Sequence, residues 1–192
     1  MWLGAVVLAA AMPFAGGCWG LRRGVASVPY LEETPTRGSF SIPRRDLFHR
    51  RHVDMADMRI HVRLFDEVVS SDLAAVFYVI PVRIRLRDKE YFDAAAIRID
   101  LDIHSSGVSR TFDPARVELE IGDEICRPAR KEFRSVELEP GRNWSFSLVF
   151  DRPMPKSESE MRLNLAPAFS PPLPPGVPAI RFKRIRWREW YS

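Results

Sequence analysis

The sequence predicts an all-β fold built from antiparallel sheets, and three observations support this. From residue 57 onward apolar and polar residues alternate with a period of two, the pattern of strands with one buried and one solvated face. Segments with turn chemistry, such as Pro140-Gly141, separate the alternating segments. After residue 56 no segment keeps a period of 3.6 over three turns, and clean alternation is typical of antiparallel sheets.

The chain begins with an apolar segment that is typical of export. Residues 2–15 carry no charge, and they fall short of the ~20 residues that a helix needs to cross a bilayer. The sequence that follows is Ala15-Gly16-Gly17-Cys18, which resembles the lipobox of bacterial lipoproteins. The resemblance implies that the preceding signal peptide is removed and that Cys18 is lipidated as the first residue of the mature chain.

Under this interpretation residues 1–17 are the signal peptide, and the protein belongs to the cell envelope. Its partners are the membrane, through the lipid on Cys18, and a further envelope protein. Trp19 stands where many inner-membrane lipoproteins have aspartate, which favours the outer membrane, facing the periplasm. Three alternatives are ordinary signal cleavage near residues 9–11 or residue 15, an uncleaved anchor, and a cytosolic apolar N-terminus.

Residues 18–56 are predicted to be a tether and lead-in to a domain at residues 57–192. Glycines and prolines interrupt its periodicity, and a short basic helix fits residues 44–52. His49 and His52 share a face on such a helix, so a two-histidine metal site is one interpretation. A solvated basic stretch is the other, and it is favoured because the intervening arginines repel a cation.

Seven alternating segments predict the strands of the domain. They are residues 58–64, 80–86, 97–103, 117–121, 144–150, 161–165 and a last strand that begins at residue 180. Six apolar residues are predicted to face one another across two sheets: Ile84, Leu101, Leu119, Phe146, Leu148 and Leu163. Six prolines between residues 167 and 178 predict a stiff connection into the last strand.

The last strand has two distinctive features. Its apolar positions change from even (180 and 182) to odd (185 and 187), which predicts a β-bulge near residues 183–184. Trp187, Trp190 and Tyr191 alternate with arginines. These aromatic residues either cap the core, which is the favoured interpretation, or insert at a membrane interface or stack on bases or sugars.

Seven to eight short antiparallel strands in a domain of this length resemble an immunoglobulin-like β-sandwich. Residues 136–186 combine a Pro-Gly turn, an aromatic strand, a Leu-rich strand, a long loop and a basic strand. This order is similar to small immunoglobulin-like domains of bacterial lipoproteins. The resemblance implies a sandwich after the signal segment and tether, and it implies no particular activity.

The charge is uneven along the chain. Residues 18–87 carry a net +4, residues 88–139 a net −5 and residues 140–192 a net +5. This distribution differs from the single basic stripe of a nucleic-acid-binding protein, so nucleic acid is not an expected partner. We expect basic residues at the two ends to orient a lipid-anchored domain on anionic headgroups. They are Arg22, Arg23, Arg44, Arg45, Arg50 and Arg51, joined by Arg181, Lys183, Arg184, Arg186 and Arg188 if the last strand lies on the same side.

The sequence holds no phosphate-binding loop, dinucleotide fingerprint, HExxH, CxxC or Gly-x-Ser-x-Gly motif. Asp100 and Asp102 share a strand face and could bind a cation with Asp93 or Glu118, but a solvated sheet face is the favoured interpretation. Cys126 is expected to be a half-buried apolar residue, with a disulfide to Cys18 as the alternative. No catalytic, cofactor-binding or metal-binding residue is therefore assigned.

The predicted function is a non-catalytic binding or assembly module of the cell envelope. The alternative is an exported hydrolase or carbohydrate-active domain on a sandwich scaffold. A pocket with a His–carboxylate pair would favour the enzyme, and a smooth sandwich with only exposed titratable groups would favour the module.

Overall fold

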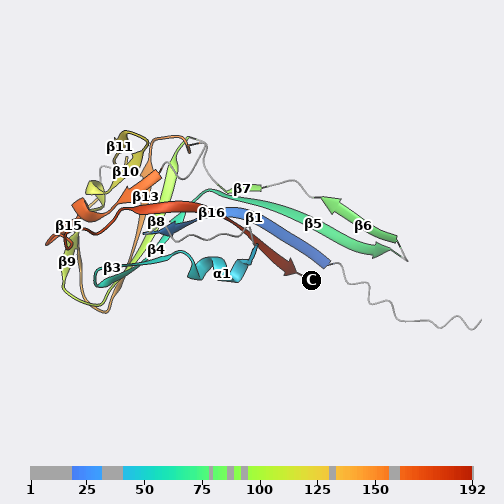
Figure 1. Cartoon of the computed structure of the whole chain (residues 1–192), viewed down its shortest axis with the longest axis horizontal. Coiled ribbons are helices and arrows are strands. Elements are labelled where there is room, and N and C mark those ends of the chain that lie inside the picture. The colour runs from blue at the N-terminus through green and yellow to red at the C-terminus, as the bar shows by residue number, and fades with distance from the viewer. Residues whose placement is uncertain are drawn as a thin grey trace, which may run out of the picture.

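The computed structural model describes residues 19–31, 41–77, 80–85, 89–91, 95–129, 133–155 and 161–191, without the side chains of residues 19, 72–91 and 191. These residues form three sheets. Their ladders are antiparallel except that the short strand β2 runs parallel to β16. The prediction of an all-β fold with antiparallel sheets is confirmed. Figure 1 shows a globular part at one end and long strands that run out of it.

The largest sheet has the order β11 (Glu124–Cys126), β10 (Glu118–Ile121), β14 (Met161–Asn164), β16 (Ile180–Tyr191), β1 (Trp19–Tyr30), β5 (Glu67–Phe77) and β6 (Ile80–Arg85), with β2 (Ile42–Pro43) on β16 and β7 (Lys89–Tyr91) on β5. A four-stranded sheet has the order β13 (Asn143–Phe150), β8 (Ile97–Ser105), β4 (Met58–Leu64) and β3 (His52–Met55). A small sheet has the order β12 (Val136–Leu138), β9 (Arg110–Phe112) and β15 (Phe169–Ser170). The helices between them are α1 (Arg44–His49), η1 (Pro114–Arg116) and η3 (Ala166–Ala168).

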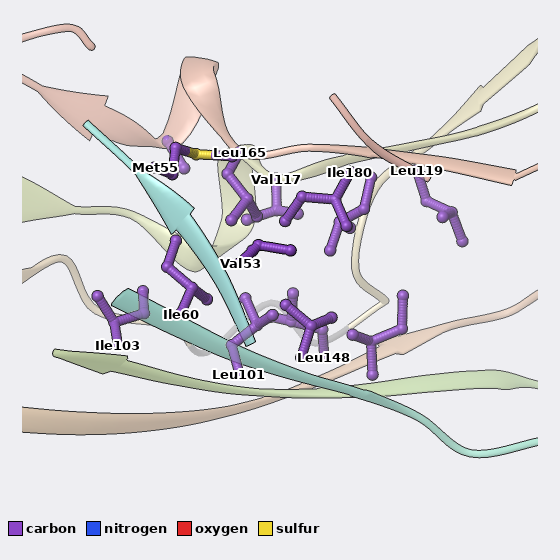
Figure 2. Close-up of a cluster of buried hydrophobic side chains, with 14 of the residues drawn as sticks. Val53, Met55, Ile60, Leu101, Ile103, Val117, Leu119, Leu148, Leu165 and Ile180 are labelled. Atoms are coloured by element: carbon purple, nitrogen blue, oxygen red, sulfur yellow. The ribbon is translucent and has the colours of Figure 1, made fainter. Parts of the chain in front are cut away.

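The main core lies between the four-stranded sheet and the β10, β14 and β16 part of the largest sheet. Alternate residues of β4 and β8 are fully or almost fully buried, as the period of two requires. Figure 2 shows side chains of the two layers meeting: Ile60, Leu101, Ile103 and Leu148 on one side, and Val117, Leu119, Leu165 and Ile180 on the other. Full burial of one such leucine or isoleucine contributes about 1.5–3 kcal/mol.

The predicted core set is largely confirmed. Leu101, Leu119, Leu148 and Leu163 are 0% exposed and belong to the main core. Phe146 packs against this core but is only half-buried, because its strand β13 lies at the edge of the four-stranded sheet. The side chain of Ile84 lies outside the described residues.

Strands β1 and β5 and residues 183–191 of β16 extend beyond the globular part, and we call them the ribbon (Figure 1). One face of the ribbon carries a second apolar cluster, covered by α1 and β2. Its buried members are Ala26, Val28, Leu47, Val69 and Trp187, with Ile42 and Ile185 packed against them. Gly24 lies beneath Trp187, and a Cβ there would be 2.6 Å from the indole ring. This close approach requires glycine.

Strand β16 contributes opposite faces to the two cores. Ile180 and Phe182 lie in the main core, whereas Ile185 and Trp187 pack in the ribbon's cluster. The ladder with β1 keeps a single register along its length, so the β-bulge predicted near residues 183–184 is wrong. Successive strand residues point to opposite faces. The apolar positions change from even to odd because the buried face changes.

The tether and lead-in predicted for residues 18–56 contains the strands β1, β2 and β3 and the helix α1 in the structure. Residues 19–30 form β1 in the interior of the largest sheet, between β16 and β5. Helix α1 agrees with the short helix expected over residues 44–52. The predicted boundaries at residues 17 and 56 remain predictions, and the lead-in supplies one central strand of the sheet.

Buried polar groups lie where the ribbon leaves the globular part. The backbone N–H of Ser27 donates to Asp66 at 3.0 Å, and the Ser27 hydroxyl donates to the same carboxylate. Arg51 lies 3.9 Å from Glu67, and both side chains are less than 10% exposed. Arg44 of α1 reaches the same glutamate at 3.8 Å. Removal of one partner of a buried ion pair leaves an uncompensated charge, so these contacts fix how the ribbon joins the domain.

Candidate functional site

The outward face of the four-stranded sheet carries a shallow groove of about 260 Å³. It crosses β4, β8 and β13, where alternation directs polar residues away from the core. Two cross-strand rows line it. The first is His61, Asp102 and Ser145, and the second is Arg63, Asp100 and Ser147. Arg98 and the half-buried Phe146 complete the lining.

Asp102 is the centre of the first row. The Ser145 hydroxyl donates to its Oδ1 at 2.6 Å. The Nδ1 atom of His61 lies 3.2 Å from its Oδ2. The imidazole is 11% exposed, whereas the carboxylate is 52% exposed. One carboxylate therefore holds a hydroxyl on one oxygen and contacts an imidazole with the other.

The imidazole of His61 lies in a cluster of rings that also includes Phe48 and His52. The ring centroid of His61 is 4.9 Å from that of His52 and 4.8 Å from that of Phe48. Burial lowers the pKa of His61, and nearby His52 and Arg51 lower it further, against an opposing effect of Asp102. The neutral imidazole is therefore favoured near pH 7.

This order of groups differs from that of a nucleophilic triad. In a triad the histidine lies between the hydroxyl and the carboxylate, so that it removes the hydroxyl proton. Here Asp102 lies between Ser145 and His61, and the hydroxyl proton of Ser145 is directed to a carboxylate. The arrangement binds polar groups better than it activates a serine.

The second row has its own ion pairs and ring contacts. The Nε atom of Arg98 donates to Asp100 at 3.2 Å. The guanidinium groups of Arg98 and Arg63 each lie 4.5 Å from the ring centroid of Phe65. Cation–π contacts of this kind contribute about 0.5–1 kcal/mol at exposed sites. The groove thus presents donors and acceptors held in place by their neighbours.

The structure separates the two histidines considered as a metal pair. His49 ends α1, and His52 belongs to β3 and meets His61 instead. No group of three or more His, Cys, Asp or Glu side chains that could hold a metal occurs in the described residues.

The acidic residues considered as a cation site are also apart. Asp100 and Asp102 line the groove, whereas Glu118 lies in the largest sheet and pairs with Arg127 at 3.0 Å. Asp93 lies outside the described residues. The two groove carboxylates already contact Arg98 and His61, so this set is not brought together.

The two cysteines have different outcomes. Cys126 is a buried free thiol in the main core, on β11, rather than half-buried as expected. Cys18 and the signal segment lie outside the described residues, so lipidation remains a prediction. In the described part of the chain no helix has the length and apolar character of a transmembrane span.

The alternation over residues 58–64 puts His61 on the polar face of its strand, and nothing else in the sequence marks it as part of a site. Asp102 follows His61 by 41 residues and Ser145 follows Asp102 by 43, and only strand register brings the three together. The chain matches no protein-family model, no curated protein and no solved structure.

Proposed function

We propose that this chain is a lipid-anchored, non-catalytic binding protein of the bacterial cell envelope. The observation that carries the binding role is the shared carboxylate of Asp102, which engages Ser145 and His61 at once and leaves no histidine on the serine hydroxyl. The anchor rests on the lipobox resemblance at Cys18. Because β1 begins at Trp19 with a cross-strand partner on β5, a lipid on Cys18 would be attached one residue from a sheet strand.

An immunoglobulin-like arrangement of the globular part belongs to the same proposal. Two antiparallel layers enclose one apolar core, as in such sandwiches. The proposal treats the ribbon as an extension of one of these layers.

The groove suits a neutral, hydroxyl-rich ligand such as a saccharide. Carboxylates of Asp100 and Asp102 accept hydrogen bonds, and the guanidinium groups of Arg63 and Arg98 donate them. Donors and acceptors that alternate across the groove match the hydroxyl groups of a sugar ring. The balance of two arginines and two aspartates disfavours a strongly charged ligand.

The lipid anchor is tested by mass spectrometry of the mature N-terminus, with and without globomycin. The anchor predicts that Cys18 is the acylated first residue and that globomycin blocks its exposure. A Cys18→Ser chain that still incorporates palmitate and still fractionates with membranes would defeat the anchor.

The groove is tested on a glycan array with the wild-type chain, Asp102→Asn and the matched control Asp54→Asn. Asp54 is 75% exposed on β3, outside the groove lining, so its loss removes the same charge. Binding that survives in the control and falls at least tenfold in Asp102→Asn supports the groove. Equal binding by all three chains, or none by the wild type, counts against it.

A hydrolase is the second candidate, because the His61–Asp102 pair lies in a groove and the pKa of His61 is lowered. A fluorophosphonate probe decides between the two. The binding role predicts that Ser145 is not labelled. Labelling that disappears in both Ser145→Ala and His61→Gln would establish the enzyme instead.

A further inference from the structure

The register of the ribbon brings the start of β1 beside the end of β16. Gly20 pairs with Tyr191, and Leu21 pairs with Trp190. Cys18 precedes this point by only a few residues, and a strand rises about 3.3 Å per residue. The aromatic C-terminal end of the last strand and the proposed lipid attachment site are therefore neighbours at the tip of the ribbon.

The two faces of the ribbon differ in what covers them. One face packs beneath α1 and β2. We call the opposite side the open face. Side chains directly across an antiparallel ladder share a face, and this side carries Leu21, Arg23, Val25, Val68, Arg186, Arg188 and Trp190. All of them are exposed or half-buried, and Trp190 is 66% exposed.

The charge of the open face is basic. Arg186 and Arg188 are exposed and alternate along β16, with Arg23 directly across from Arg188. Glu189 belongs to the other face, where it accepts a hydrogen bond from Arg44 at 3.2 Å. Asp72 of β5 is an acidic position on the open side, directly across from Leu21, and Arg85 of β6 is directly across from Asp72 and formally balances its charge.

Three other arginines considered for membrane contact lie beside acidic side chains. Arg51 is 8% exposed and lies beside Glu67. Arg44 contacts Glu67, Glu189 and the ring of Trp187 beneath α1. Arg184 lies 3.9 Å from buried Asp66, at the base of the ribbon.

We propose that the open face of the ribbon is a membrane-contact surface that takes anionic phospholipid headgroups. Arg23, Arg186 and Arg188 approach the phosphates, and Trp190 lies at the level of the headgroups, where amphipathic rings concentrate. This inference rests on the proposed anchor at Cys18, because the lipid would hold the open face within about one Debye length, ~10 Å at 0.1 M salt. The surface orients the domain and leaves the groove on the globular part exposed.

The test uses residues 18–192 with Cys18→Ser, which keeps every described residue and removes the lipid. Its partition onto phosphatidylcholine vesicles is compared with that onto vesicles of phosphatidylcholine and phosphatidylglycerol, at about 0.05 M and about 0.5 M salt. The open face predicts binding to the anionic vesicles alone, and loss of that binding at high salt. Binding to neither vesicle, or equal binding to both, overturns the proposal.

Two triple variants identify the surface. Arg23→Gln, Arg186→Gln and Arg188→Gln together should weaken partition on the order of 100-fold, about fivefold or about 1 kcal/mol per arginine. The control changes the exposed Arg116, Arg134 and Arg142 to glutamine, which removes the same charge outside the open face. An equal loss in the control overturns the proposal, because net charge alone would then explain binding.

The lipid anchor at Cys18 and the membrane-contact surface are tested by separate experiments, so the failure of one can be distinguished from the failure of the other. The acylation state of Cys18 is read by mass spectrometry, and the vesicle assay uses a chain without lipid. Circular dichroism checks that both triple variants fold, since all six arginines are exposed.

Discussion

Trp187 and Trp190 lie three residues apart on one strand, and their truncation distinguishes the two faces of the ribbon. Trp187 is 0% exposed in the cluster beneath α1, whereas Trp190 is 66% exposed on the open face. If the buried face of β16 changes along the strand, Trp187→Ala should destabilise the fold strongly. Trp190→Ala should then change the free energy of unfolding by less than about 0.5 kcal/mol.

The magnitude for Trp187→Ala follows from its surroundings. Truncation of a buried tryptophan costs about 3–5 kcal/mol. The contact with Arg44, whose guanidinium lies 4.9 Å from the ring centroid, adds about 0.5–1 kcal/mol. The indole Nε1 is buried without a hydrogen-bond partner, and its removal recovers about 1–3 kcal/mol. The expected net loss is about 3 kcal/mol.

The assay is urea unfolding of residues 18–192 with Cys18→Ser, followed by far-ultraviolet circular dichroism, because both variants remove a fluorophore. In thermal unfolding of the same chain, a loss of about 3 kcal/mol would lower the midpoint temperature by roughly 6–12 °C for a domain of this size. Equal effects of Trp187→Ala and Trp190→Ala would refute the change of face on β16. A larger effect of Trp190→Ala would do so more strongly.

Three further changes test other parts of the account in the same chain. Gly24→Ala places a Cβ 2.5 Å from the carbonyl oxygen of Val68, so the free energy of unfolding should fall by about 1–3 kcal/mol. An unchanged urea midpoint would contradict this packing. The pKa of His61 is lowered from 6.5 in the fold, so the unfolded chain takes up this proton first and stability should fall as pH drops below about 6.5. His61→Gln should reduce the slope of the free energy of unfolding against pH between pH 7.5 and 5.5. Identical slopes in the wild type and the variant would exclude the effect. Phe146→Ala should lower the free energy of unfolding in urea by about 2 kcal/mol, because the ring is half-buried beside Phe112. Truncation of a fully buried phenylalanine costs ~3–5 kcal/mol. A loss at the upper end of that range would mean that Phe146 on β13 is fully buried.

The globular part follows from the sequence because its strands have one apolar and one polar face. Strands β4 and β8 bury alternate residues from end to end, and the same period locates β10, β13 and β14. Leu101 and Leu148 are predictable core residues for this reason. In a half-buried antiparallel strand, apolar residues on the buried face alternate with polar residues on the solvated face, so the sequence shows both environments.

The ribbon could not be predicted in the same way. Strand β1 carries Arg22 and Arg23 in succession, and β5 contains the pair Val68 and Val69. These doublets arise because one face packs only against a short helix and the other is open, so neither face is uniformly apolar. On β16 the change of buried face moves the apolar positions from even to odd, as a β-bulge would also do. Only the register of β16 with β1 distinguishes these two explanations.

The groove depends on register as well. His61, Asp102 and Ser145 occupy ordinary outward positions on three strands, and nothing in their local sequence marks them as a site. A shift of one residue in any ladder would turn one member into the core. The residue types were visible in the sequence, whereas their juxtaposition is a product of tertiary pairing.

Quenching of Trp190 by brominated phospholipids tests most directly whether the open face meets the membrane. The acylated chain is purified and reconstituted into anionic vesicles that carry bromine near the headgroups, with Trp190→Phe and the half-buried Trp144→Phe as comparisons. The account predicts that tryptophan fluorescence is quenched in the wild type, that Trp190→Phe removes much of the quenched component, and that Trp144→Phe leaves it intact. Identical quenching in the wild type and Trp190→Phe, or none in the wild type, would contradict the account.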